Sequence, residues 1–183
     1  MRMISEMLPI LATPNIIALL FRSLLAIICA GVIGYERDTH GSAAGFRTHI
    51  LVCFGAMIAM STGQYAAMYY TADITRIGAQ VVSGIGFLGA GTIIVNKHRI
   101  TGLTTAAGLW AAACIGLAIG IGFYEGALVG TVFVYFTERV LHDFTKWVRR
   151  KNAADDSDNG GISDNGGISD NSGNSNKGDI SAM

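Results

Sequence analysis

Long apolar stretches alternate with short polar segments along the first 140 or so residues of the chain. A helix that spans the hydrocarbon core of a bilayer needs about 20 mostly apolar residues. Five stretches approach this length, at about residues 15–35, 48–70, 77–96, 102–124 and 125–140. The three central stretches contain no Asp, Glu, Lys or Arg, whereas Arg22 interrupts the first. The pattern predicts an all-α membrane protein, a bundle of about five transmembrane helices over residues 15–140.

Segments of a different character flank this predicted bundle. Residues 1–14 form a short N-terminal segment, and residues 141–151 place apolar side chains among basic ones at helical spacing. We expect the latter to form a basic amphipathic extension on the membrane surface. Residues 152–183 are rich in Asp, Asn, Gly and Ser and repeat the sequence Asp-Asn-Gly-Gly-Ile-Ser. We expect this tail to be disordered, because it has too few apolar residues to offset its ordering entropy.

Composition excludes several classes of protein. Hydrophobic residues make up 51% and charged residues only 14% of the chain, against about 25% charged residues in soluble domains. The mean hydropathy of +0.44 includes the polar tail, so a soluble enzyme is excluded. The formal net charge is zero, which argues against nucleic-acid binding through bulk charge. Three cysteines, at positions 29, 53 and 114, indicate neither a disulfide framework nor a zinc site.

Basic residues predict the orientation of the five spans, because loops on the cytoplasmic side carry more Lys and Arg. One side of the bundle would carry Arg37, Arg47, Lys97, Arg99, Lys146, Arg149, Arg150 and Lys151. The other side would carry only Arg2 and Arg76, with Arg22 in the outer half of the first span. We therefore expect the N-terminus outside, the C-terminus in the cytoplasm, and a location in the bacterial inner membrane.

Glycines are spaced for helix packing. The string from Gly84 to Gly89 matches the letters of a dinucleotide-binding loop, but it lies inside an apolar stretch with no acid from Ala90 to Tyr124. Glycines three or four residues apart instead let a neighbouring helix approach closely in a membrane. The candidate packing glycines are Gly84, Gly86, Gly89, Gly91, Gly116, Gly120, Gly126 and Gly130. The pattern leaves open whether they pack within one chain or between chains.

Polar residues near the spans are few, so each is a candidate for a function. On the outer side, Arg22 could extend to the membrane surface, form an ion pair with Glu125, or belong to a functional site. The other candidate functional residues are Glu36, Arg37, Asp38, Arg47, Gln80, Asn96, Thr104 and Thr105. Those on the inner side form either a charge network that fixes loops and helix ends or a functional vestibule.

Reaction chemistry is not indicated. No nucleophile lies in a pattern with a base, so we expect no enzyme and no cofactor. The four histidines, His40, His49, His98 and His142, all fall on the predicted inner side. No pair of them has ligand spacing on one helix face, so no metal site is predicted.

Four linked motifs resemble the MgtC/SapB family over about residues 17–140. They are Gly34-Tyr35-Glu36-Arg37, Ala44-Gly45-Phe46-Arg47-Thr48-His49, Ala79-Gln80-Val81-Val82-Ser83-Gly84-Ile85-Gly86-Phe87-Leu88-Gly89-Ala90-Gly91 and Gly102-Leu103-Thr104-Thr105-Ala106-Ala107-Gly108-Leu109-Trp110. They occur in the order and spacing of the family. The candidate residues in the family's motif regions are Glu36, Arg37, Arg47, Gln80, Asn96, Thr104 and Thr105.

The resemblance implies a multi-pass inner-membrane protein associated with growth in low magnesium and with survival inside host phagocytes. Some members are linked to restraint of the proton-translocating ATP synthase. Longer members carry a folded cytoplasmic C-terminal domain, and we expect this chain to be a short form that ends in the repeat tail instead.

Three functions are compatible with the sequence. The first is a regulatory membrane protein that acts by lateral contact with another membrane complex, with the bilayer and a second copy as further partners. The alternative is a small cation transporter or channel, although no span carries an acid at mid-depth. The third is a structural or lipid-organising protein, which only the basic extension supports.

Overall fold

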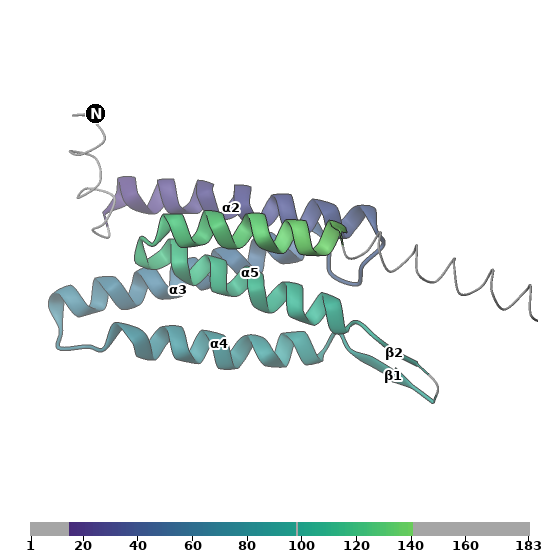
Figure 1. The fold of residues 1–183 in the computed structure, drawn as a ribbon. Helices are drawn as coiled ribbons and strands as arrows, with labels where there is room; N and C mark the ends of the chain where they lie inside the picture. The colour runs from purple at the N-terminus through teal and green to yellow at the C-terminus, as the bar shows by residue number, and fades with distance from the viewer. Residues whose placement is uncertain (1–14, 98, 141–183) are drawn as a thin grey trace, which may run out of the picture. The chain divides into compact units, whose positions relative to one another are not determined.

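The computed structural model describes residues 15–97 and 99–140, and they form a helical bundle with one hairpin (Figure 1). The helices are α2 (Ile16–Thr39), α3 (Phe46–Tyr69), α4 (Ile74–Ala90), α5 (Leu103–Ile121) and a helix over residues 124–140. Strands β1 (Ile94–Asn96) and β2 (Arg99–Thr101) lie between α4 and α5. The predictions for residues 1–14, 141–151 and 152–183 fall outside the described residues.

Helix lengths agree with a membrane protein. Within the described part of the chain, α2, α3 and α5 are long and apolar enough to cross a bilayer, and α4 is a shorter apolar helix of 17 residues. Large apolar side chains are exposed along all of these helices, with Phe87 exposed by 84%. The predicted helical fold class is confirmed, while the number of spans and their orientation stay predictions.

The sequence prediction of a helix over residues 77–96 is wrong at its C-terminal end. Helix α4 ends at Ala90, and β1 pairs antiparallel with β2, with Asn96 opposite Arg99. The β-branched run that follows Gly91 favours an extended strand over a helix. The candidate residue Asn96 therefore lies on an exposed strand rather than at the end of a membrane span.

Local capping explains where several helices begin. The side chain of Asn15 accepts a hydrogen bond from the Ala18 amide at 2.8 Å, and Asp73 accepts one from the Thr75 amide at 2.9 Å. Gly102 precedes α5 with φ +90°, where a Cβ would overlap the carbonyl of Thr92. Only glycine fits this turn without strain.

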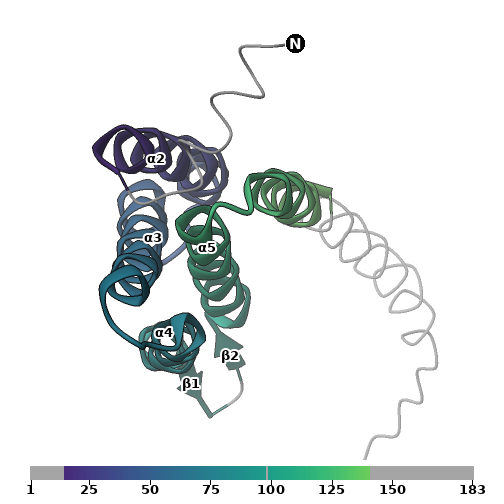
Figure 2. The ribbon, with the colours of Figure 1, turned by 90° about the vertical axis from the view of Figure 1, so that its left-hand side faces the viewer.

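Viewed from one end, α2, α3 and α4 follow one another in an arc, and α5 packs on its inner side (Figure 2). The core is made of small and medium side chains such as Ala30, Cys53, Met57 and Ala112. Small residues allow backbones to approach closely, and close packing is a main source of helix association in a membrane.

The candidate packing glycines differ in what surrounds them. A Cβ at Gly116 would overlap the carbonyl of Cys53, and one at Gly120 would lie 2.6 Å from the carbonyl oxygen of Met57. These two glycines therefore seat α5 directly on α3. A Cβ at Gly126 would overlap the ring of Phe123, a side chain three residues earlier in the chain. Looser contacts surround Gly89 (Ala106), Gly91 (Leu88) and Gly130 (Ile115), whereas Gly84 and Gly86 have no described neighbour within 4 Å.

Candidate functional site

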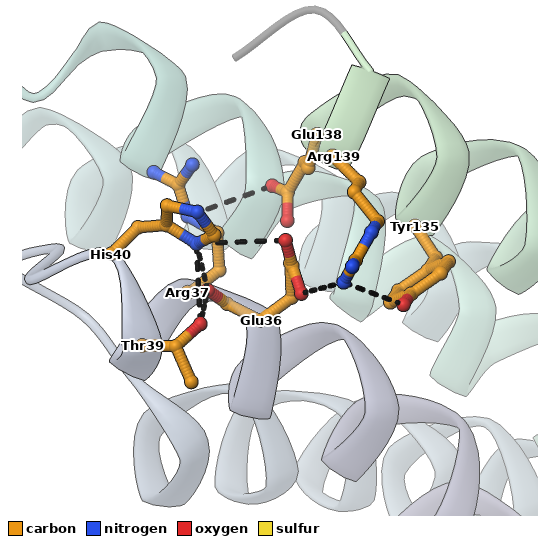
Figure 3. Close-up of polar contacts among 7 residues, drawn as sticks. All are labelled: Glu36, Arg37, Thr39, His40, Tyr135, Glu138 and Arg139. Carbon is orange, nitrogen blue, oxygen red and sulfur yellow. Dashed lines mark hydrogen bonds and ion pairs between the residues drawn. The ribbon is translucent and has the colours of Figure 1, made fainter. Parts of the chain in front are cut away.

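A cluster of charged side chains lies where the end of α2 meets the end of the 124–140 helix (Figure 3). We call Glu36, Arg37, His40, Glu138 and Arg139 the carboxylate cluster. Arg139 Nη1 lies 3.1 Å from Glu36 Oε2, and Arg37 Nε lies 3.7 Å from Glu138 Oε1. His40 Nδ1 lies 3.5 Å from Glu36 Oε1. Two carboxylates and two guanidinium groups thus compensate one another.

Both carboxylates are withdrawn from the surface, whereas their partners are accessible to different degrees. Glu36 is 4% exposed, and the side chains of Glu138 and Arg139 are 7% and 58% exposed. The Arg139 guanidinium also donates to the Tyr135 hydroxyl at 3.3 Å. The Glu36 carboxylate is therefore paired with an arginine whose side chain remains partly exposed.

The cluster connects to α5 and α3 as well. Arg37 Nη2 donates to the Thr105 hydroxyl of α5 at 3.1 Å. His49 of α3 is fully buried, and its Nδ1 lies 3.0 Å from the carbonyl oxygen of Gly45. This contact requires a proton on Nδ1, which leaves Nε2 as the acceptor in the neutral ring. Four helices therefore contribute to one polar region.

Glycines allow the helices to close around this region. A Cβ at Gly34 would lie 2.7 Å from the Cα of Phe46, so α2 and α3 approach each other there. A Cβ at Gly108 would lie 2.7 Å from Glu138 Oε1 and 3.3 Å from His49 Nε2. The carboxylate and the imidazole thus approach the same glycine of α5.

Several buried atoms of this region lack a hydrogen bond within the described part of the chain. They are Glu36 Oε1, Arg37 Nε, His49 Nε2 and Glu138 Oε2. An unpaired buried polar atom costs roughly 1–3 kcal/mol, and such atoms need water, an ion or a partner. The region can therefore accept a further polar species. No three His, Cys, Asp or Glu side chains among the described residues are grouped to hold a metal ion.

Only part of this site was predicted from the sequence. Glu36, Arg37 and Thr105 come together, but the sequence did not single out their neighbours Glu138, Arg139 and Tyr135. His40 and His49 were noted only as histidines of the predicted inner side. The signals available were the place of His49 in a motif and the position of Glu138 at the end of the last apolar stretch. Neither signal indicates which residue, more than 80 positions away in the sequence, lies next to His49 or Glu138 in the fold.

The other candidates lie apart from the carboxylate cluster. Asp38 covers Gly45 at the start of α3, where a Cβ would overlap its carboxylate. The side chains of Arg47, Gln80 and Thr104 are exposed on α3, α4 and α5. These exposed candidates therefore lie on three different helices, and the choice between a charge network and a functional vestibule on the inner side stays a prediction.

Near the start of α2, Arg22 is fully buried, so of the three possibilities that the sequence left open, extension of its side chain to the membrane surface does not occur. Its Nη1 donates to the Gly120 carbonyl at 2.7 Å and to Gln64 Oε1 at 2.8 Å, and its Nε donates to the Tyr124 hydroxyl at 3.2 Å. Ser61 lies 3.3 Å from Nη1. No ion pair with the exposed Glu125 occurs among the described contacts. The Gly120 carbonyl lies in the last turn of α5, at the negative end of the helix dipole, which attracts a cation.

Comparison with known proteins identifies relatives along most of this fold. The family model described as the MgtC family matches residues 24–147. YhiD of Escherichia coli K12, described as a candidate magnesium transporter, is 41% identical over 139 residues, which are 73% of this chain and 65% of YhiD. MgtC of Brucella abortus is 41% identical, with 63% of this chain and 48% of MgtC covered.

SapB of Bacillus subtilis is 35% identical, with 72% of this chain and 58% of SapB covered. The chain therefore spans about half to two thirds of the length of these relatives. No solved structure matches it. The family match extends over most of the helical bundle, and the chain belongs to the MgtC family.

Proposed function

We propose that this chain is a non-catalytic regulatory protein of the bacterial inner membrane that acts by lateral contact with another membrane complex. The setting we propose is adaptation to low magnesium or to stress inside a host cell. The name of one relative, YhiD of Escherichia coli K12, refers to magnesium and supports this setting. The proton-translocating ATP synthase is one candidate partner, and a second copy of the chain is another.

The observation that carries this proposal is the outer face of α4. Ser83, Gly84 and Phe87 lie three, four and seven residues after Gln80, so the four residues share one side of the helix. All four are exposed, and Gly84 has no described neighbour within 4 Å. We call these four residues the α4 face.

An amide side chain on a lipid-facing surface is unfavourable unless another protein group satisfies it. Small residues beside Gln80 favour close approach of a second helix, and Phe87, which is 84% exposed, provides an apolar anchor. The α4 face therefore has the composition of a surface that contacts another membrane helix.

Charge supports the proposed orientation. The loop after α2 and the β1–β2 hairpin lie at the same end of the bundle (Figure 1). These segments and their flanks carry Arg37, Arg47, Lys97 and Arg99. We assign this end to the cytoplasm, because cytoplasmic loops are enriched in basic residues.

Photo-cross-linking in cells tests the contact. A photoreactive amino acid would replace Ser83 of the α4 face, and in a matched control it would replace Val132, which is 65% exposed on the 124–140 helix. We expect a discrete adduct from position 83 in low magnesium, weakened by Gln80→Leu. Antibodies against ATP synthase subunits and against the chain itself identify the partner. Equal adducts from both positions contradict a specific α4 face.

A transporter or channel for a cation is the second candidate function. The observation that favours it is the pair of buried carboxylates, Glu36 and Glu138, each with an oxygen that lacks a described hydrogen bond. Such groups can exchange protons or bind a passing cation. This function predicts ion flux that Glu36→Gln abolishes, whereas regulation by contact predicts none.

A further inference from the structure

A groove of about 490 Å³ runs between α3 and α4, outside the carboxylate cluster and beside the α4 face. Its apolar walls include Leu51 of α3 and Leu88 of α4, which are 69% and 54% exposed. Gly55 and Gly84 lie on facing helices, and a Cβ at either position would meet no described atom within 4 Å. The two glycines therefore leave the groove open along its length.

One end of the groove is polar. Arg47 and Thr48, in the first turn of α3, line this end with exposed side chains. No acidic residue is among the groove's described lining residues, so its charge is positive. An occupant that complements the groove has an apolar body and a negatively charged end.

The length of the groove indicates which occupant fits. The distance from Arg47 to Gly55 is eight residues of helix, or about 12 Å. One leaflet contributes about half of the roughly 30 Å hydrocarbon core. A transmembrane helix of a partner would need a track through both leaflets, whereas a lipid tail needs only one.

We propose that this groove is a binding site for an anionic phospholipid of the cytoplasmic leaflet. One acyl chain lies between α3 and α4 over Gly55 and Gly84. The headgroup phosphate lies at Arg47, whose guanidinium pairs with phosphate through two parallel N–H groups, and Thr48 supplies a hydroxyl donor. The site rests on the proposed orientation and shares Gly84 with the α4 face, whereas Arg47 and Gly55 belong to the groove alone.

The chain provides matched variants for a test. Gly84→Leu places a large side chain in the groove, whereas Gly86→Leu places the same side chain two residues away, at a glycine that is equally open but does not line the groove. Arg47→Gln removes the charge at the groove, and Arg76→Gln removes an exposed charge near the other end of α4. Gly55→Leu blocks the groove from the α3 side.

Native mass spectrometry of the delipidated full chain counts bound lipids after incubation with equal amounts of phosphatidylglycerol and phosphatidylcholine. We expect the wild type to retain phosphatidylglycerol preferentially, and Arg47→Gln to reduce that preference about fivefold. Gly84→Leu should reduce retention of both lipids. Gly86→Leu and Arg76→Gln should bind like the wild type.

Several results would overturn the proposal. Equal lipid binding by Gly84→Leu and Gly86→Leu, or an unchanged preference after Arg47→Gln, indicates ordinary boundary lipid. A wild-type dimer that becomes a monomer in Gly84→Leu and Gly55→Leu, with lipid binding unchanged, indicates a second copy in the groove. Thermal unfolding verifies that each variant is folded. If Gly84→Leu does not fold, lipid binding by Gly55→Leu and Arg47→Gln tests the proposed site.

Discussion

Charged side chains are buried at both ends of the helical bundle, but the two ends accommodate them in different ways. The described contacts of Arg22 are with neutral acceptors, namely a backbone carbonyl, a carboxamide and two hydroxyls. The carboxylate cluster pairs charges of opposite sign, yet it leaves buried atoms of Glu36 and Glu138 without a described hydrogen bond. The first arrangement fixes the ends of three helices, and the second retains capacity to bind or exchange a polar species.

The largest expected effect follows from removing the guanidinium at the outer end. Arg22→Met removes the guanidinium that donates to the Gln64 side chain and to the Gly120 carbonyl, which then keeps only the Ser61 hydroxyl as a described donor. We expect a loss of roughly 3 kcal/mol in the free energy of unfolding. Arg22→Lys should recover part of this loss. Unfolding of the full chain in detergent measures both, and wild-type stability of Arg22→Met contradicts a structural role.

A smaller loss is expected at the carboxylate cluster. Glu36→Gln keeps the shape of the side chain but removes the charge that faces Arg139 and His40. The Arg139 side chain is 58% exposed, so without its partner it can turn to the membrane surface. We therefore expect Glu36→Gln to lower the free energy of unfolding by about 1–2 kcal/mol. Unfolding of the full chain in detergent tests whether Glu36→Gln lowers the free energy of unfolding less than Arg22→Met does. A loss greater than that of Arg22→Met would reverse the comparison between the two ends.

Two glycines of α5 allow the packing at the carboxylate cluster to be compared with the packing between α3 and α5. Gly108→Ala adds a Cβ 2.7 Å from Glu138 Oε1, so the flexible carboxylate must move, at an expected cost of about 1 kcal/mol. Gly116→Ala provides the contrast, because its Cβ would meet the backbone carbonyl of Cys53, which cannot move as easily. Equal stability of the two variants, measured by thermal unfolding, would argue that the cluster is as rigid as the α3–α5 contact.

The smallest effect is expected at Arg139. A partly exposed ion pair contributes roughly 0–1 kcal/mol, so Arg139→Gln should leave unfolding nearly unchanged. A double-mutant cycle with Glu36→Gln isolates the coupling between the two side chains. A coupling well above 1 kcal/mol would show that the pair behaves as a fully buried one.

Periodicity predicted the helices because membrane spans need long apolar runs, and those runs are visible in one sequence. It failed at the end of α4, where β-branched residues after Gly91 favour a strand although they are as apolar as a helix. Spacing also indicated that Gly116 and Gly120 are suited to close packing, and the structure places both against α3. The same spacing at Gly84 does not reveal that this glycine lies on an open groove.

Long-range pairing explains what the sequence could not predict about the site. Glu36 and Arg139 are 103 residues apart, and nothing local indicates that the end of α2 meets the end of the 124–140 helix. The sequence left three possibilities open for Arg22, an ion pair with Glu125 among them. The described structure places its guanidinium at the carbonyl end of α5, a contact that becomes visible only when the helix termini are placed in space.

Ion flux is the most direct test of whether the chain regulates by contact or transports a cation. The purified full chain would be reconstituted into liposomes that contain a magnesium-sensitive dye and a proton-sensitive dye, with Glu36→Gln as the matched variant. Folding and insertion would be verified for both proteins. Regulation by contact predicts the same dye signal as in empty liposomes for either ion. Flux from the wild type that is lost in Glu36→Gln would contradict this account and make the carboxylate cluster part of a transport path.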